Sequence, residues 1–195
     1  HNNGLVKSVK FTDHKYVGDP LNAVRIFNEK QADEIIVVDI DATVLSKEPD
    51  YTRIKNLANE CRMPLCYGGG VKTLEQAKRI IGLGVEKVAI SSAAIENYDF
   101  ISSLAAQIGN QSVVIVIDVK KSLFGAKYDV CIHNGKKKTG KNPLEFARQM
   151  QECGAGEIVI NSVDNDGMMK GYDFALIDKL RDLIHVPRSE ERRVG

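Results

Sequence analysis

The sequence predicts an α/β protein whose parallel strands and helices alternate around a (β/α)8 TIM barrel. Short apolar runs and helical segments follow one another along the chain, as strand–helix–strand crossovers require. The chain also repeats itself, because residues 20–64 and 143–187 align without a gap and share 13 identities in 45 positions. This duplication indicates two half-barrels, of which the chain has room for about six strand–helix units. An open doubly wound sheet is the alternative, but polar residues clustered after the strands favour the barrel.

Local signals place the elements of the first part of the chain. Residues 20–30 form a helix, since Asp19 can cap its first turn and Pro20 fits the first position. Residues 34–39 contain an Ile-Ile-Val-Val run without polar alternation, typical of a parallel strand buried on both faces. A helix at 74–81 begins after Thr73, a candidate cap. The other expected elements are a first strand ending within 5–11, a helix at 50–61, and strands at 64–67 and 87–90.

The second part of the chain continues the alternation and adds one excursion. Residues 112–120 are the clearest buried strand, since Val113 begins the run Val-Val-Ile-Val-Ile-Asp. Residues 128–133 form one arm of an excursion closed by Asn134-Gly135, a dipeptide typical of hairpin turns. The remaining expected elements are helices at 98–108, 143–153 and 172–184 and a strand at 157–162.

Both ends of the chain differ from the pattern of a complete barrel. The chain starts at His1 without an initiator Met, and the repeat predicts a short strand and a glycine loop after Pro187. Instead, a charged run with no strand or helix pattern follows. We therefore expect residues 1–187 to be a partial barrel and residues 188–195 to be a non-native or disordered tail. Such a fragment would expose strand edges, aggregate and lack activity.

Composition excludes several classes of protein. The chain has 195 residues, 43% of them hydrophobic and 27% charged, which is typical of a globular protein with a large core. A formal net charge of +1 argues against a nucleic-acid surface, and no apolar run is long enough for a membrane. The four cysteines show no CxxC spacing and the four histidines are scattered. We expect reduced cysteines, no metal, no cofactor and a cytoplasmic location.

Polar and glycine residues follow the predicted strands, where barrel enzymes place their active sites. Gly68-Gly69-Gly70 would bring backbone N–H groups close to a ligand, and Ser91-Ser92 after the next strand would add donors. Together they predict a phosphate site, although the glycines alone could form a plain tight turn. Residues 164–167 could anchor another end of the ligand or form an Asx turn.

Asp118 is the candidate catalytic residue. It ends a run of apolar β-branched residues, where desolvation would raise the proton affinity of a carboxylate, as a general acid or base requires. The alternative is a structural ion pair with Lys120 or another lysine.

Three charged residues precede or begin alternate strands, namely Glu34, Lys87 and Glu157. Alternate strands contribute to the same interior layer of a barrel, so these side chains could meet at the bottom of its lumen. From spacing alone, ordinary solvated charges at the rim are the simpler interpretation.

An ordered set of motifs resembles the cyclase subunit of imidazole glycerol phosphate synthase, from histidine biosynthesis. The motifs are Leu5-Val6-Lys7, Gly18-Asp19-Pro20, Ala32-Asp33-Glu34, Gly68-Gly69-Gly70, Lys87-Val88, Ser92-Ala93-Ala94, Val116-Ile117-Asp118, Gly154-Ala155-Gly156-Glu157, Asp164-Asn165-Asp166-Gly167 and Gly171-Tyr172-Asp173. The resemblance covers the chain from about Gly4 to Pro187.

This resemblance implies an enzyme of the lyase/cyclase type that forms a heterodimer with a glutaminase docked at the bottom of the barrel. Ammonia from the glutaminase would react with a phosphoribulosyl-formimino carboxamide ribonucleotide, giving imidazole glycerol phosphate and an aminoimidazole carboxamide ribonucleotide. Asp118 matches one of two catalytic aspartates. Residues that match substrate and phosphate contacts are Lys7, Gly70, Ser92, Asp164 and Gly167, and Gly69 and Ser91 complete the predicted substrate and phosphate site. Glu34, Lys87 and Glu157 match a charged ammonia gate, which replaces the rim interpretation.

The chain also departs from the family pattern. The other catalytic aspartate would lie just before His1, and the loops after the last two strands of the barrel are absent. Asp41, Ser91 and Asn161 stand where the family has Thr, Asn and Thr, and Asn2-Asn3 replaces Lys-Asp. These changes resemble a paralogous branch that supplies ammonia for amidino modification of surface sugars. The sister isomerase of the same pathway and a non-enzymatic barrel that activates an amidotransferase are further alternatives.

Overall fold

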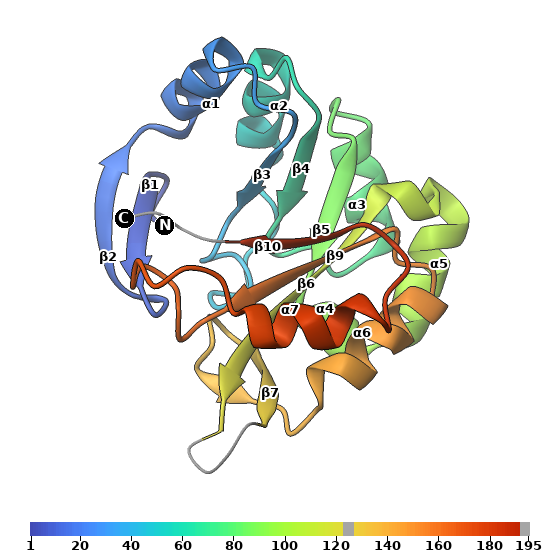
Figure 1. Ribbon diagram of the computed structural model, residues 1–195. Helices are drawn as coiled ribbons and strands as arrows, with labels where there is room; N and C mark the ends of the chain where they lie inside the picture. The colour runs from blue at the N-terminus through green and yellow to red at the C-terminus, as the bar shows by residue number, and fades with distance from the viewer. Residues whose placement is uncertain (123–126, 192–195) are drawn as a thin grey trace.

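A curved parallel sheet forms the centre of the molecule (Figure 1). The computed structural model describes residues 1–122 and 127–191. Six strands of the sheet lie side by side in the order β10-β9-β6-β5-β4-β3, all parallel to their neighbours. Their bounds are β3 Ile35–Val38, β4 Leu65–Gly68, β5 Lys87–Ile90, β6 Val113–Lys121, β9 Glu157–Ser162 and β10 Arg188–Glu191. Within the described residues the sheet is open, with β3 and β10 at its edges.

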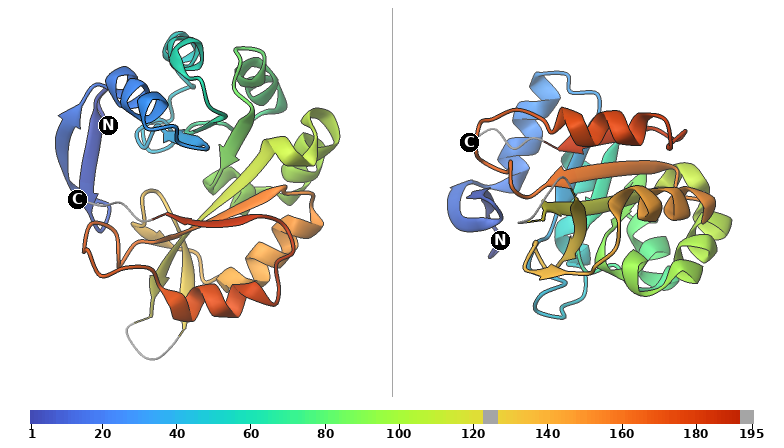
Figure 2. Two further views of the ribbon diagram at one scale, coloured as in Figure 1. Left: turned by 45° about the horizontal axis from the view of Figure 1, so that its top comes forward. Right: turned by 60° about the horizontal axis from the view of Figure 1, so that its bottom comes forward.

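Helices cover the outer side of the sheet (Figure 2). They are α1 Pro20–Glu29, α2 Tyr51–Glu60, α3 Leu74–Ile81, α4 Ser92–Glu96, α5 Tyr98–Ile108, α6 Pro143–Glu152 and α7 Phe174–Arg181, with a 3-10 turn at Asn110–Ser112. The predicted caps are confirmed, because Asp19 accepts the backbone N–H of Leu21 at 2.8 Å and Thr73 forms a capping box with Gln76. The sequence analysis missed α4, which is only five residues long.

The sheet separates two apolar clusters. The larger cluster fills the layer between strands and helices, and Ile115, Phe146 and Leu180 are among its buried members. A smaller cluster lies on the opposite face and contains Cys66, Ala89, Val114 and Val159. Because side chains alternate between the two faces of a strand, the smaller cluster marks the face that becomes the lumen when such a sheet curves into a barrel.

The internal repeat is visible in the structure. Helices α1 and α6 begin at Pro20 and Pro143 and end at Glu29 and Glu152, so both ends keep the spacing of 123 residues found in the sequence. The helices that follow also match, because Asp50 caps α2 and its repeat counterpart Asp173 caps α7. The two halves therefore share helix starts and caps as well as sequence.

A strand forms within residues 5–11 as predicted, but it is not the first strand of the parallel sheet. Residues of β1 (Leu5–Val9) pair antiparallel with β2 (Thr12–Gly18) in a separate two-stranded sheet and do not join the parallel sheet. Two consecutive residues with positive φ, Lys10 and Phe11, turn the chain back. Polar residues also interrupt this segment, whereas the buried parallel strands are continuous apolar runs.

The excursion after β6 forms a hairpin as expected. Strand β7 (Tyr128–Ile132) pairs antiparallel with both β6 and β8 (Lys137–Lys138). The turn contains Asn134 and Gly135, both with positive φ, as the dipeptide predicts.

Residues 188–195 were expected to be a non-native or disordered tail, and the first four of them are ordered as a strand. Arg188–Glu191 forms strand β10, whose backbone pairs parallel with β9. Backbone pairing along an exposed strand edge does not require apolar side chains, so a charged segment can occupy it. Residues 192–195, also assigned to the tail, lie outside the described residues. In the described part of the chain, no helix has the length and apolar character needed to span a bilayer.

Candidate functional site

Asp118 lies near the carboxyl end of β6, directly opposite Asn161 of β9 in the parallel register. The side-chain amide of Asn161 donates a hydrogen bond from Nδ2 to Oδ1 of Asp118 at 3.1 Å. Asn161 is buried, whereas Asp118 is half-buried and therefore accessible to a small molecule. The site thus presents a carboxylate held from one side by a neutral donor.

The surroundings of Asp118 are set by the hairpin that follows β6. Lys120, predicted as a possible partner, donates its ammonium group to the carbonyl oxygen of Gly135 at 2.6 Å. Cys131 on β7 lies opposite Asp118 in the antiparallel register. Burial raises the pKa of the Cys131 thiol to about 11, so this neighbour is a neutral thiol near pH 7.

The glycine loop after β4 packs tightly against the loop after β3. Gly69 has φ +110°, and a Cβ there would lie 2.9 Å from the backbone nitrogen of Asp39. Gly70 has φ +73°, and its N–H points to Oγ1 of Thr43 at 3.3 Å. Only glycine tolerates this combination of backbone conformation and close approach. The loop geometry therefore has a structural reason, and its phosphate-binding role stays a prediction.

Ser91 and Ser92 follow β5, as the sequence predicted. Ser91 precedes helix α4 but its hydroxyl makes no capping hydrogen bond, and Ser92 is the first helical residue. Both side chains are half-buried. The Ser91 hydroxyl is not used in helix capping, which is consistent with, but does not test, a role in ligand binding.

The loop after β9 is anchored on two sides by its aspartates. Asp164 accepts the backbone N–H of Lys121 through Oδ2 at 2.8 Å. Asp166, which is buried, accepts the Ser8 hydroxyl at 2.8 Å and the Phe11 backbone N–H at 2.9 Å through Oδ2. Both carboxylates therefore hold protein groups. The backbone N–H groups of Asn165 and Asp166 are also engaged, since both donate to the Ser162 carbonyl oxygen at 3.0 Å, and an anion-binding role for this loop stays a prediction.

Gly167 and Lys7 connect this loop to the first hairpin. Gly167 has φ +65°, and a Cβ there would collide with the carbonyl oxygen of Ser8. Lys7 neighbours Ser8 on β1, pairs with Lys15 of β2, and is half-buried. Lys7 therefore lies one residue before Ser8, through which β1 contacts Asp166.

At the opposite end of the sheet, Lys87 lies between two glutamates. Its Nζ is 2.8 Å from Oε2 of Glu34 and 2.9 Å from Oε2 of Glu157. Burial alone would lower the pKa of Lys87, but the hydrogen bonds that its ammonium group donates to both carboxylates outweigh burial and hold the pKa above its ordinary value. The three charges therefore meet, as the family resemblance implied and as spacing alone did not predict. Oε1 of Glu34 is buried and has no hydrogen-bond partner among the described residues.

The space between the two ends is lined by small apolar side chains. On β9 the residues Glu157, Val159 and Asn161 face the same side, since side chains alternate along a strand. The distance from Glu157 to Asn161 along the strand is about 13 Å. Val114, Val159 and Ala89 are buried between these levels. The charged cluster and Asp118 therefore lie at opposite ends of one apolar face of the sheet.

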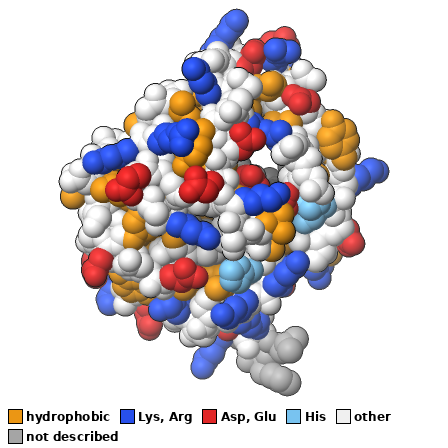
Figure 3. Space-filling model, turned by 180° about the vertical axis from the view of Figure 1, so that it is seen from behind, with side chains coloured by type: hydrophobic (Ala, Val, Ile, Leu, Met, Phe, Trp, Pro, Cys, Tyr) orange, Lys and Arg blue, Asp and Glu red, His pale blue; other side chains and the backbone are white. Residues whose placement is uncertain are grey.

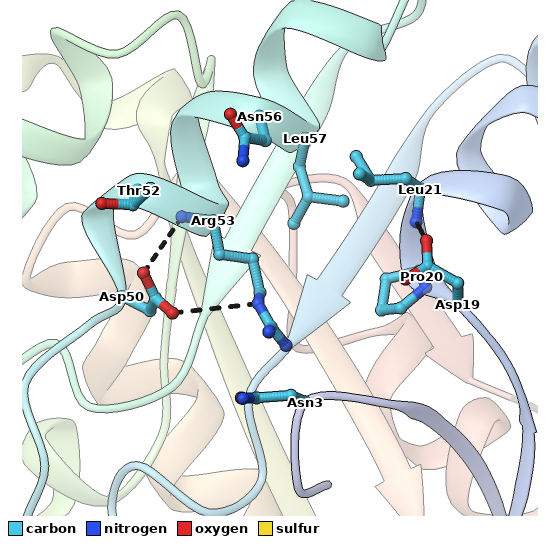
Figure 4. A pocket seen from close by; sticks show the side chains of 9 residues that line it. All are labelled: Asn3, Asp19, Pro20, Leu21, Asp50, Thr52, Arg53, Asn56 and Leu57. Carbon is cyan, nitrogen blue, oxygen red and sulfur yellow. Dashed lines mark hydrogen bonds and ion pairs between the residues drawn. The ribbon is translucent and has the colours of Figure 1, made fainter.

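A cavity of about 210 Å³ lies elsewhere, between the first turns of α1 and α2 (Figure 4). None of the predicted site residues lines it; its walls are Asn3, Asp19, Pro20, Leu21, Asp50, Thr52, Arg53, Asn56 and Leu57. Arg53 extends towards Asn3, and its Nε lies 3.8 Å from the Asp50 carboxylate. The two acidic residues in its walls, Asp19 and Asp50, cap helices α1 and α2, so their presence here is explained by helix capping.

The reverse face of the molecule has acidic and basic side chains intermixed around a hollow (Figure 3). No single sign of charge dominates this face, in keeping with the net charge of +1. Among the described residues, no group of three His, Cys, Asp or Glu side chains is arranged as a metal site requires.

Sequence reasoning missed a second cluster near the site. Asp173 is buried and accepts the Tyr128 hydroxyl at 2.9 Å and the Lys121 ammonium group at 2.9 Å. Lys121 therefore holds both Asp164 and Asp173, near the two ends of the loop after β9. The repeat marks Asp173 as the counterpart of Asp50, but this predicts a cap and not a bond to β6.

Comparison with known proteins identifies the family. The family described as "Histidine biosynthesis protein" matches residues 2–189. A Vibrio vulnificus protein named "Putative imidazole glycerol phosphate synthase subunit hisF3" is 59% identical over 184 residues, which cover 94% of this chain and 71% of the relative. The corresponding HisF protein of Leptospira interrogans is 58% identical over 94% of this chain and 72% of its own length. The hisF2 protein of Pseudomonas aeruginosa is 51% identical over 94% and 73%. The chain therefore belongs to the histidine biosynthesis protein family of (β/α)8 barrels, and its relatives there are named as putative HisF subunits of imidazole glycerol phosphate synthase.

Proposed function

We propose that this chain is the ammonia-using cyclase subunit of a two-component synthase. It would take ammonia from a glutaminase subunit and convert the phosphoribulosyl-formimino carboxamide ribonucleotide to imidazole glycerol phosphate, acting in the cytoplasm as a lyase/cyclase without a cofactor. The observation that carries the proposal is the arrangement of two polar sites at opposite ends of one apolar face. These sites are the Lys87 cluster at the amino ends of the strands and Asp118 near their carboxyl ends.

The Lys87 cluster would serve as the entrance for ammonia. The cluster closes this end of the face with charged side chains, which ions and water would have to displace. The buried Oε1 of Glu34 is available as an acceptor for an N–H of ammonia. Beyond the cluster, Ala89, Val114 and Val159 offer no hydrogen bond that would hold the molecule back. Ammonia could therefore travel to Asp118 without being retained.

Asp118 would transfer protons at the reacting centre. Attack of ammonia and closure of an imidazole ring require removal of protons from nitrogen and delivery of protons to leaving groups. A half-buried carboxylate beside a neutral amide donor can do both. Phosphate groups of the substrate would lie at the Gly69–Gly70 and Ser91–Ser92 loops and at the Asp164–Gly167 segment, with Lys7 as a further contact.

A second candidate function is ammonia supply for amidino modification of a surface sugar. The departure at Asn161 favours it, because this residue lies at the proposed acid–base group. Asn161 contacts Asp118, and Asp41 accepts the backbone N–H of Asn2 and contacts His1 at 2.7 Å each. This alternative keeps the ammonia path and changes the substrate contacts. The sister isomerase uses no ammonia and would leave the Lys87 cluster without a function.

Turnover of the ribonucleotide by the full-length protein tests the proposal. The substrate is supplied with ammonium chloride, and the loss of its absorbance and the formation of both products are followed. We expect turnover that depends on ammonia concentration. A folded protein that stimulates or binds a glutaminase but leaves the ribonucleotide unchanged would support the surface-sugar function instead. Loss of both activities would contradict both candidates.

A further inference from the structure

The hydrogen bond between Asn161 and Asp118 is built into the sheet. The two residues are direct partners in the parallel register of β6 and β9, which extends over six residue pairs. The two strands that carry Asp118 and Asn161, β6 and β9, are among the most buried in the protein. Neither backbone can move without breaking the hydrogen bonds between β6 and β9. The backbone therefore fixes the positions from which the two side chains reach their contact at 3.1 Å.

The chemistry of the pair is asymmetric. Asn161 is 7% exposed, and a buried amide requires hydrogen-bond partners to offset its desolvation. With Nδ2 facing Asp118, it donates to the carboxylate and cannot exchange a proton with it. A carboxylate held through Oδ1 loses rotational freedom about its χ angles, so this hydrogen bond helps to set the direction of the Asp118 carboxylate.

We propose that Asn161 is a positioning residue that orients Asp118 for proton transfer. The inference rests on the proposed role of Asp118 as the acid–base group, and it assigns the amide no contact with the reacting atoms. It also gives a reason for Asn at a position where the family pattern has Thr. The nitrogen of Asn lies one bond further from the backbone than a threonine hydroxyl, so the two donors would hold the carboxylate in different places. Asn161 would thereby adapt the catalytic geometry of this chain.

Substitutions that keep the size of the side chain separate positioning from packing. Asn161→Leu removes the donor, Asn161→Asp replaces it with a like charge, and Asn161→Thr restores a donor at a shorter reach. Ser162→Ala is the matched control, because Ser162 is the adjacent buried residue and faces the other side of β9. Urea unfolding of each variant shows whether the sheet is intact.

Steady-state kinetics with saturating ammonia distinguish the outcomes. We expect Asn161→Leu to lower kcat by about 10- to 100-fold, a part of the ~10²–10⁴-fold that acid–base catalysis supplies, with little change in KM. Asn161→Asp should lower kcat further, Asn161→Thr should recover part of it, and Ser162→Ala should leave it unchanged.

Two results would overturn the inference while the proposed function stands. One is an Asn161→Leu variant with the parent kcat beside an inactive Asp118→Asn variant. The other is a rise in KM at unchanged kcat, which would make Asn161 a substrate contact. If Asp118→Asn itself keeps the parent turnover, the proposed function fails, and the inference fails with it. If Asn161→Leu does not fold, the Asn161→Thr kcat decides, since a purely structural role predicts the parent value for a folded variant.

Discussion

Lys87 and Glu157 form an ion pair of 2.9 Å between strands β5 and β9, although 70 residues separate them in the sequence. Glu34, the counterpart of Glu157 in the internal repeat, binds the same ammonium group at 2.8 Å. One lysine thus bridges equivalent glutamates of the two half-barrels. The duplication explains why the acidic residues come in a pair.

Replacing Lys87 by Met should affect glutamine-driven turnover more than turnover driven by added ammonia. The substitution opens the entrance and leaves two carboxylates facing each other, whereas ammonia from solution at high concentration can reach Asp118 by other routes. We expect the ratio of glutamine-driven to ammonia-driven rates to fall about tenfold or more, equivalent to about 1.4 kcal/mol. Both rates are measured with the glutaminase present.

Arg25→Met is the control for this experiment, because it breaks an exposed ion pair with Glu60 that lies outside the cluster. Its rate ratio should equal that of the parent. An equal fall of both rates in Lys87→Met would contradict a gating role and indicate a general loss of structure.

Gly69→Ala should destabilise the protein by about 1–3 kcal/mol. The φ of +110° is unfavourable for any residue with a Cβ, and the added carbon would meet the backbone of Asp39. Gly140→Ala is the matched comparison, since Gly140 has φ +74° but no atom within 4 Å of the added carbon. Urea unfolding of both variants measures the difference. If both variants lose the same free energy of unfolding, the contact with Asp39 has no influence on stability.

Asp173 should make the stability of the protein depend on pH in the acidic range. Burial alone would raise the pKa of this carboxyl, but the hydrogen bonds from Lys121 and Tyr128 outweigh burial and lower it. A lowered folded-state pKa contributes stability above the unfolded value of about 3.9, and this contribution disappears as the pH falls through the folded value. The free energy of unfolding of the parent should therefore approach that of Asp173→Asn below about pH 4.

Chemical denaturation between pH 7 and pH 2.5 tests this dependence. Asp178→Asn serves as the control, because Asp178 is exposed and pairs with Arg181 on the surface of α7. A difference between the parent and Asp173→Asn that stays constant over this range would contradict the assignment.

Local signals in the sequence were sufficient for most of the fold. The apolar run from Val113, the caps at Asp19 and Thr73 and the Asn134-Gly135 turn each act within a few residues, and all are found in the structure. The repeat added the relation between α1 and α6. The first hairpin could not be predicted, because its turn at Lys10 and Phe11 has positive φ without the glycine or asparagine that usually indicates it.

The site was predicted less completely because its contacts join distant segments. Asp166 and Ser8 are 158 residues apart, and no spacing rule connects them. The Lys87 cluster was recognised only through the family resemblance, since the spacing alone also fits solvated charges. The repeat predicted a strand after Pro187, where β10 lies, but the charged side chains of this segment show no strand pattern and therefore argued against it.

The comparison of the parent with Asp118→Asn tests the central claim most directly. The assay is ammonia-dependent turnover of the ribonucleotide by the full-length protein at saturating substrate. The neutral, nearly isosteric amide should keep the fold and substrate binding but lower kcat by about 10²- to 10⁴-fold, since it cannot exchange protons. Turnover at the parent rate by a folded Asp118→Asn protein would contradict the account.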